Sequence, residues 1–389
     1  MRNLLILFFI VNQSFSSQIG AWRDYYSYNG AKKVFYQNNQ TYCLTENGLF
    51  SLDHQANELF LFSKLNYTSD FGINNLAFSS NRLIISYENS NIDIIEDDLT
   101  SSITDIKNLE ITGKKINNLT VIDNELYISA SYGVSKINLI KKEISDTYYL
   151  YKNGESIEIN DFKKIDNYYL AATNIGVFKA EKNSLLNDPS NWSQIDTNSN
   201  VVKIVNGSRI IFLYENESET NYKVSEDISN ISSILISANN LNNITYSNDK
   251  FLFVYDNSIV ISTNGIDTLD NYNENLRLAK FKSACYDDQN NIWIADSING
   301  LIKITNGSVE STILPSGPSS NNVFDLNFSN SKLFMSHGGH SNYNVNNLNY
   351  QGVSVLDNNS WKSYTSQFLG NSRDIVSSTT NGDYEYFAS

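Results

Sequence analysis

Apolar and polar residues alternate along almost the whole chain in short runs of four to six positions. The sequence Leu-Tyr-Ile-Ser at 126–129 is typical, and clusters of Asn and Asp separate one run from the next. Alternation with a period of two predicts β-strands, and the Asn/Asp clusters predict tight turns between antiparallel neighbours. No window after residue 16 carries the apolar stripe of a helix. The pattern therefore predicts an all-β protein.

These runs are organised in a unit of roughly forty residues that recurs along the chain. The clear copies lie at residues 34–53, 73–95, 116–138, 159–181, 241–263 and 281–305, a degenerate copy at 201–225 and a longer one at 323–357. The glycine that opens the third strand recurs at Gly48, Gly133, Gly176, Gly300 and Gly352. Four short strands per unit, apolar on both faces, predict a β-propeller, because neighbouring blades then bury both faces of every sheet. A β-sandwich or a solenoid also has short strands, but neither explains this repeat.

The number of units predicts how the chain divides. Eight units and a ninth that begins at Asp374 predict a seven-bladed propeller at 19–314 and the start of a second propeller at 315–389. The turn Pro315-Ser316-Gly317-Pro318 is the predicted crossing point. We expect a strand around Trp22 to complete the outer edge of the last blade. The alternative is that the chain leaves one propeller, builds the other and returns.

The first residues predict export. Arg2, the apolar run at 4–11 and the small residues Ser14 and Ser16 form a signal peptide at 1–16. Eight apolar residues are too few to span a bilayer. Removal of this segment changes the net charge from −14 to −15, because Arg2 is its only charged residue. Such an acidic chain disfavours nucleic acid as a partner.

Few residues predict catalysis or metal binding. The histidines are His54, His337 and His340, and none stands at a recognisable spacing from a nucleophile. A metal reading of His337 and His340 lacks a third ligand, and the acidic segment 287–291 lacks the spacing of a calcium loop, so a strand-connecting turn is favoured. Cys43 and Cys285 are predicted to be core thiols, with a disulfide as the alternative if the first and seventh blades meet. We predict no enzyme, no metal and no cofactor.

Paired lysines predict a basic rim beside the central channel. Lys32, Lys33, Lys114 and Lys115 enter innermost strands, and Lys163 and Lys164 lie within or beside one. These six residues are the predicted glycan-binding site, although Glu46 and other acids in nearby turns oppose it. Solvated lysines at a sheet edge are the alternative. Stacking of sugars on Tyr87, Tyr132, Tyr255 or Trp293 is a second route, against which core packing is favoured.

The segment after the signal peptide resembles a known family. The similar stretches are Ile19-Gly20-Ala21-Trp22-Arg23-Asp24-Tyr25 and residues 28–31, 42–53, 63–66, 86–93, 338–339 and 352–357, with Trp361. This pattern resembles the amino-terminal propeller of the PorZ family of the type IX secretion system of Bacteroidetes. Members of that family carry two propellers and a sorting domain, so the resemblance implies that this chain is incomplete.

The resemblance implies a non-enzymatic component of the outer-membrane cell surface, reached through the periplasm. Such a component works beside a PorU-like sortase and PorV- and PorQ-like membrane proteins, and binds anionic lipopolysaccharide to which secreted cargo is attached. Two other classes remain at the level of sequence. One is the periplasmic ligand-sensing propeller of a two-component regulator, and the other is a polysaccharide-degrading propeller enzyme, which the three scattered histidines disfavour.

Overall fold

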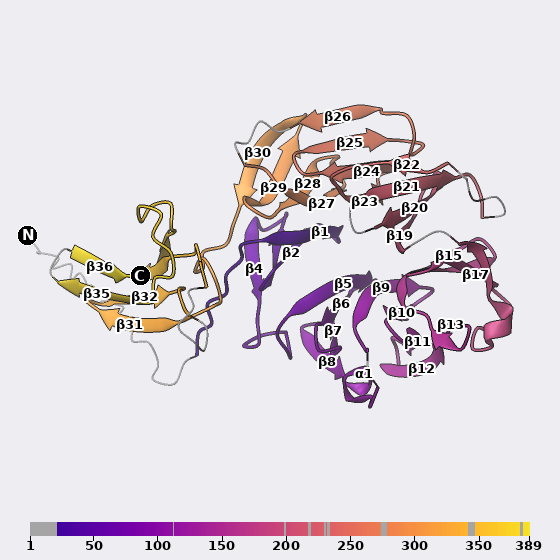
Figure 1. The fold of residues 1–389 in the computed structure, drawn as a ribbon, viewed down its shortest axis with the longest axis horizontal. Helices are drawn as coiled ribbons and strands as arrows, with labels where there is room; N and C mark the ends of the chain where they lie inside the picture. Colours follow the sequence, from indigo (N-terminus) through magenta and orange to yellow (C-terminus); the bar gives the residue numbers. More distant parts are fainter. Residues whose placement is uncertain are drawn as a thin grey trace, which may run out of the picture.

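The computed structural model describes residues 22–111, 113–197, 200–216, 219–228, 231, 234–273, 278–340, 347–381 and 384–389. The predicted signal peptide lies outside the described residues. Seven four-stranded antiparallel sheets follow one another between residues 31 and 313 of this part and form a ring (Figure 1). Each sheet is a meander whose four strands are consecutive in the chain. The prediction of an all-β propeller with seven four-stranded blades is confirmed.

The blades are numbered here in chain order. Blades 1 and 2 comprise β1 (Ala31–Gln37), β2 (Gln40–Thr45), β3 (Leu49–Asp53), β4 (Glu58–Phe62) and β5 (Ile73–Ser79), β6 (Arg82–Tyr87), β7 (Ile92–Glu96), β8 (Leu99–Ile103). Blades 3 and 4 comprise β9 (Ile116–Ile122), β10 (Glu125–Ala130), β11 (Gly133–Asn138), β12 (Glu143–Tyr148) and β15 (Ile159–Ile165), β16 (Tyr168–Thr173), β17 (Gly176–Glu181), β18 (Ser193–Asp196). The short pieces between strands are α1 (Asp105–Asn108), η1 (Pro189–Asn191) and the hairpin of β13 (Tyr151–Lys152) and β14 (Glu155–Ser156).

The remaining blades continue the same meander. Blades 5 and 6 comprise β19 (Val201–Asn206), β20 (Ile210–Glu215), β21 (Thr220–Ser225), β22 (Ile236–Ser237) and β23 (Leu241–Ser247), β24 (Lys250–Tyr255), β25 (Ser258–Ser262), β26 (Asp270–Asn273). Blade 7 comprises β27 (Phe281–Tyr286), β28 (Ile292–Asp296), β29 (Gly300–Thr305) and β30 (Ser308–Ile313). The first strand of each blade surrounds the centre of the ring in Figure 1.

Asn and Asp residues make the tightest turns of the blades. The two-residue loops Asn38–Asn39, Asp123–Asn124 and Asn248–Asp249 join the first and second strands of three blades, and both residues of each have positive φ between 48° and 63°. Two consecutive residues of this kind form the type I′ hairpin, which matches the twist of antiparallel strands. The Asn/Asp clusters of the sequence are therefore the hairpins between strands.

The glycine that opens the third strand avoids a backbone clash. Gly133 has φ +144°, and a Cβ there would lie 2.3 Å from the carbonyl oxygen of Tyr148 in the outer strand. Gly300 has φ +85°, and a Cβ there would lie 2.7 Å from the carbonyl oxygen of Ile313. The repeated glycine lets the outer strand approach closely.

The core of the ring consists of apolar clusters between neighbouring blades. Ile84 and Ile94 of blade 2 pack against Leu119 and Ile128 of blade 3. The ring closes in the same way between blade 7 and blade 1, where Trp293 and Leu301 pack against Phe50 and its neighbours. Closure rests on side-chain packing between complete sheets.

The expected closing strand around Trp22 is therefore wrong. Blade 7 takes its outer strand β30 from its own repeat, so the position of the fourth strand is already filled. Trp22 is 86% exposed, and residues 22–29 form no strand. This segment instead lies along the chain that follows β30, with a hydrogen bond of 2.7 Å from the amide of Ser27 to Asn321 Oδ1.

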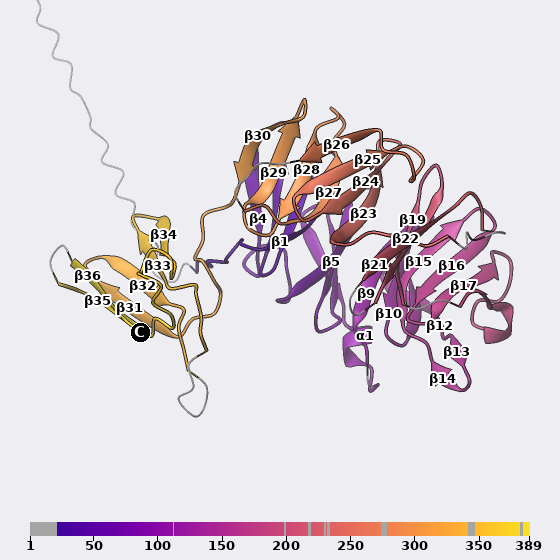
Figure 2. The same cartoon turned by 45° about the horizontal axis from the view of Figure 1, so that its top comes forward.

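Six further strands lie beside the ring, joined to it by the chain before β1 and after β30 (Figure 2). They are β31 (Asp325–Ser329), β32 (Lys332–Ser336), β33 (Val353–Asp357), β34 (Ser360–Tyr364), β35 (Ser377–Asn381) and β36 (Tyr384–Ala388). The first four form one sheet, and β35 pairs with β36. Phe334 and Val355 of the sheet pack against Ile375 and Phe387. These strands lie in the segment 315–389, for which the start of a second propeller stays a prediction.

Among the described residues, no helix has the length and apolar character needed to cross a bilayer.

Candidate ligand-binding channel

A channel of about 960 Å³ runs through the centre of the ring between the innermost strands. Each of these seven strands carries a β-bulge at its second residue, where the register with the second strand shifts by one position. A bulge redirects the side chains around it. The second residues are Lys32, Asn74, Asn117, Asn160, Val202, Asn242 and Lys282. The third residues are Lys33, Asn75, Asn118, Asp161, Lys203, Asn243 and Ser283.

Four of the asparagines at the second position tie neighbouring blades together. The Nδ2 groups of Asn74, Asn117, Asn160 and Asn242 donate to the carbonyl oxygen of the first residue in the next innermost strand, at 2.6, 2.9, 2.8 and 2.8 Å. We call these four residues the amide belt. Where blades 1 and 7 meet, the second position is a lysine in both blades.

Five of the described lysines line the channel: Lys32, Lys33, Lys163, Lys203 and Lys282. Lys33 donates to Asn75 Oδ1, and Lys203 donates to Asn243 Oδ1 at 2.7 Å and to the carbonyl oxygen of Ile244 at 2.8 Å. Burial is the main cause that lowers the pKa of Lys33 to about 8 and that of Lys203 to about 7, and neighbouring lysines add to it. The ammonium groups of Lys33 and Lys203 are therefore partly desolvated, and their hydrogen-bond acceptors are uncharged amide oxygens.

Asp161 is the carboxylate set among these lysines. It is buried and accepts hydrogen bonds from the amides of Phe162 and Ile204 at 2.8 and 2.9 Å and from Asn118 Nδ2 at 2.7 Å. Lys163 Nζ lies 3.2 Å from its Oδ1. Asp161 lies behind the channel wall, and among the described residues that line the channel itself the one carboxylate belongs to Glu46.

The structure brings together three of the six lysines predicted to form the basic rim. Lys32, Lys33 and Lys163 line the channel. Lys164 follows Lys163 in β15 and forms an ion pair with Asp123. Lys115 is exposed and directly precedes β9. The role of the predicted lysines in glycan binding stays a prediction.

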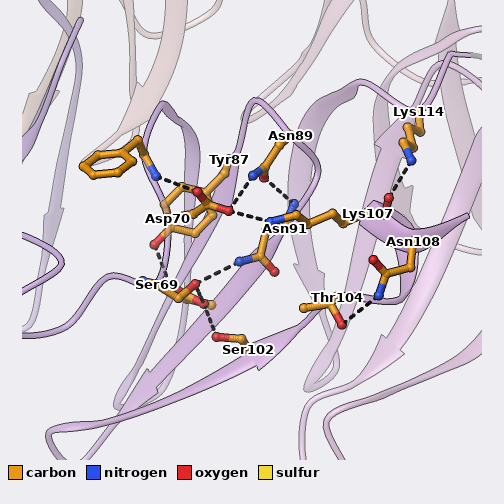
Figure 3. A network of polar contacts seen from close by, with 12 residues as sticks. Ser69, Asp70, Tyr87, Asn89, Asn91, Ser102, Thr104, Lys107, Asn108 and Lys114 are labelled. Carbon is orange, nitrogen blue, oxygen red and sulfur yellow. Dashed lines mark hydrogen bonds and ion pairs between the residues drawn. The ribbon is translucent and has the colours of Figure 1, made fainter.

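Lys114 belongs to a different cluster, in blades 2 and 3 (Figure 3). Its ammonium donates to the carbonyl oxygens of Lys107 and Leu109, the latter at 3.0 Å. In the same cluster Lys107 lies 2.8 Å from Asp70. Desolvation opposes the shift, but the hydrogen bonds from Lys107 and Asn89 hold the pKa of Asp70 down at about 2. Lys114 therefore stabilises the loop around α1 and lies outside the channel.

Sequence reasoning missed Lys203 and Lys282. Neither belongs to a lysine pair, and Lys203 opens the degenerate copy of the repeat. Both occupy the same positions of their strands as Lys33 and Lys32, respectively. Both lysines can be found from the sequence when the repeats are aligned on their first strands, because they then fall at the positions of Lys33 and Lys32.

The other predicted candidates are structural. The ring nitrogens of buried His337 lie 2.7 Å from the carbonyl oxygen of Asn322 and 2.8 Å from Ser354 Oγ. Asp287 accepts hydrogen bonds of 2.9 Å from the amides of Gln289 and Asn291, and also from the side chain of Trp293, which confirms the turn reading. No group of three metal-ligating side chains occurs within the described ranges.

The predicted thiols and aromatic residues also belong to the core. Cys43 and Cys285 are free thiols that meet in the cluster between blades 1 and 7. Burial raises the pKa of both thiols. Tyr87, Tyr132 and Trp293 are buried, so stacking on a sugar is excluded for them.

Fold and channel together define a seven-bladed β-propeller with a lysine-bearing centre. Two solved propeller structures are similar to this chain in fold only. A streptogramin B lyase superposes with a TM-score of 0.55 at 16% identity, over 74% of this chain and 97% of that chain. The WD40 propeller of Doa1 superposes with a TM-score of 0.53 at 10% identity, over 72% of this chain and 96% of that chain. No curated protein sequence matches the chain.

Within this class the chain is similar to PorZ. Residues 41–193 match the family model described as the N-terminal β-propeller domain of PorZ of the type IX secretion system. The structure of PorZ from Porphyromonas gingivalis, described as an essential bacterial surface component of that system, superposes with a TM-score of 0.78 at 19% identity. The match covers 95% of this chain and 50% of that chain, so this chain spans half the length of PorZ. The predicted resemblance is confirmed.

Proposed function

We propose that this chain is a non-enzymatic surface component of a type IX secretion system that acts in the manner of PorZ. The observation that carries the proposal is the match of residues 41–193 to the PorZ propeller family, supported by a superposition over 95% of the chain. In this role the protein is exported through the periplasm to the outer-membrane surface. It assists the attachment of secreted cargo to anionic lipopolysaccharide.

Deletion of the gene in the organism that encodes the chain tests this proposal. We expect cargo proteins with a type IX sorting domain to lose their surface attachment, and expression of the intact gene to restore it. Protease treatment of whole cells should degrade the protein on the wild-type surface. Normal cargo attachment in the deletion strain, together with a changed transcription profile, would favour the ligand-sensing alternative.

Binding of anionic lipopolysaccharide is the finer part of the proposal. Lys32, Lys33 and Lys163 from the predicted site line the channel, and we propose that acidic groups of the glycan contact them there. A pull-down with lipopolysaccharide from the same organism should retain the wild-type chain and lose Lys32→Glu with Lys33→Glu. Lys114→Glu with Lys115→Glu lies outside the channel and serves as the control. Equal retention of all three proteins removes this site.

We also propose that a PorU-like sortase and PorV- and PorQ-like membrane proteins are the partners of this chain. Support comes only from the family whose model residues 41–193 match. Cross-linking in whole cells, followed by affinity purification of the tagged protein, should recover them. Recovery of an inner-membrane kinase in their place would refute the assignment.

A further inference from the structure

The cations of the channel are gathered in four blades and lie on opposite sides of the ring. Lys32 and Lys33 come from blade 1 and Lys282 from the adjacent blade 7, whereas Lys163 and Lys203 come from blades 4 and 5. In a ring of seven blades these two groups face each other across the centre. A chain with a net charge of −14 thus concentrates positive charge at its axis.

Most of these ammonium groups lack a carboxylate partner. Among the described residues, Lys163 is the channel lysine with an ion pair, to Asp161 at 3.2 Å. Lys282 donates to Asn242 Oδ1 at 3.1 Å, while Lys33 and Lys203 use the neutral oxygens named above. Asp161 accepts hydrogen bonds from two backbone amides and Asn118, its charge raises the pKa of Lys33 and of Lys203, and Glu46 also lines the channel. Five lysines face these two carboxylates, so cationic side chains outnumber anionic ones in the channel.

Lys33 and Lys203 lie close to other cations. Burial is the largest cause that lowers the pKa of both lysines, and the charge of Asp161 opposes it. The charges of Lys163 and Lys33 lower the pKa of Lys203 further, and the charge of Lys32 lowers that of Lys33. Like charges held in partial burial destabilise their site until an anion enters. Binding of an anion between them relieves this repulsion.

We propose that the central channel of this propeller binds a phosphate group, as inorganic phosphate or as the phosphate of a sugar phosphate. The cationic side chains of the channel are all lysines, whose compact ammonium groups suit a tetrahedral dianion approached from several sides. Among the described residues that line the channel there is no arginine, whose planar fork matches one face of a carboxylate or phosphate, whereas several separate ammonium groups can surround a dianion as point charges. The volume of about 960 Å³ lies at the upper end of the range for small-molecule sites and admits a sugar phosphate. The inference concerns the same channel lysines that we propose to contact the glycan and rests on that part of the proposed function, but its test is separate, because phosphate binding by the purified chain is measured without cargo attachment in cells.

Isothermal titration of the full chain with inorganic phosphate, glucose 6-phosphate and glucuronate tests this inference. We expect saturable binding of one or both phosphates and at least tenfold weaker binding of glucuronate. Preference for inorganic phosphate assigns the site to the free ion, and preference for glucose 6-phosphate assigns it to a phosphorylated glycan. Either result supports the proposal. Equal binding of glucuronate, or no binding of either phosphate, overturns it.

Matched variants locate the binding site. Lys33→Gln with Lys203→Gln should weaken phosphate binding at least tenfold, whereas Lys114→Gln with Lys164→Gln, outside the channel, should leave it unchanged. Lys32→Gln at the second position of β1 provides a milder channel variant, with an expected loss of about threefold, should the double variant fail to fold. Circular dichroism confirms the fold of each variant. Unchanged binding in the folded channel variants would also overturn the proposal.

Discussion

Lys203 shows how its place in the repeat determines the chemistry of a side chain. The residue stands third in β19, behind the bulge, and this position directs its ammonium towards Asn243 and the carbonyl oxygen of Ile244. Burial then lowers its pKa to about 7. The same position of β1 gives Lys33, whose pKa burial lowers to about 8. Two residues 170 positions apart in sequence thus become one pair of interacting cations.

The low pKa of Lys203 has a consequence for stability. Its folded pKa lies below the ordinary value of 10.5, so the unfolded chain binds more protons than the folded chain between about pH 7 and 10.5. The free energy of unfolding should therefore rise with pH in this window. Lys203→Met should make that slope shallower, as measured by urea unfolding at about pH 7, 8.5 and 10. Lys164→Met, outside the channel, should keep the wild-type slope, and an unchanged slope in Lys203→Met would contradict the assignment.

At the scale of the element, the innermost strands line the channel and also connect neighbouring blades by hydrogen bonds. The asparagines of the amide belt cross from one blade to the first carbonyl of the next, and this contact recurs in four of the seven blades. Buried carbonyl oxygens that lose a donor cost free energy, so each link stabilises one junction between blades. The belt supplements the apolar clusters with a directional contact.

Asn117→Ala should remove one link of the belt. The side chain donates to the carbonyl oxygen of Ile159 and to Glu158 Oε1, both at 2.9 Å. We expect the free energy of unfolding to fall by about 1–2 kcal/mol, since both acceptors lose their donor. Chemical denaturation measures this change. Asn183→Ala, in an exposed turn, should change stability by less than about 0.5 kcal/mol, and an equal effect of the two substitutions would show that the belt is not stabilising.

The closure between blades 7 and 1 offers a second test at this scale. Trp293 is 1% exposed, packs against Phe50 and Cys43, and donates its Nε1 hydrogen to Asp287. Trp293→Ala should destabilise the ring by about 3–5 kcal/mol through the cavity that it leaves. Trp293→Phe, which loses the hydrogen bond but keeps an aromatic ring, should cost about 1–2 kcal/mol. A cost below about 1 kcal/mol for Trp293→Ala would contradict closure by packing at this residue.

Sequence patterns predicted the strands better than the contacts between them. Alternation and the Asn/Asp turns placed the innermost strands at Ile73, Ile116 and Ile159, because strand and hairpin propensities are local. The prediction of a closing strand around Trp22 was wrong. The ring closes by the packing of Trp293 on Phe50, and the spacing of residues in the sequence does not reveal such a contact. Three of the lysines that line the channel stood among the six predicted residues, because pairs of lysines stand out in a sequence. Lys203 and Lys282 can be recognised only from their positions in the repeat.

At the scale of the whole molecule, the ring is complete by itself and yet touches the strands beside it. The segment before β1 lies along the chain after β30: Asn29 Nδ2 donates to the carbonyl oxygen of Ser319 at 3.0 Å, and Tyr25 packs edge-on against Trp361. Gly317 permits this approach, because a Cβ there would lie 2.1 Å from the carbonyl oxygen of Tyr26. The contacts fix the direction in which the chain leaves the ring.

Because none of the seven sheets borrows a strand, a chain of residues 22–314 should fold without the rest. Removal of residues 315–389 takes Trp361 away from Tyr25 but leaves the cluster of Trp293 and Phe50 intact. We expect one cooperative thermal transition and the same phosphate titration as the full chain. A truncated chain that stays unfolded, while the full chain folds, would show that the ring depends on the strands beyond the predicted boundary at 314. A folded truncated chain that no longer binds phosphate would instead show that those strands shape the channel.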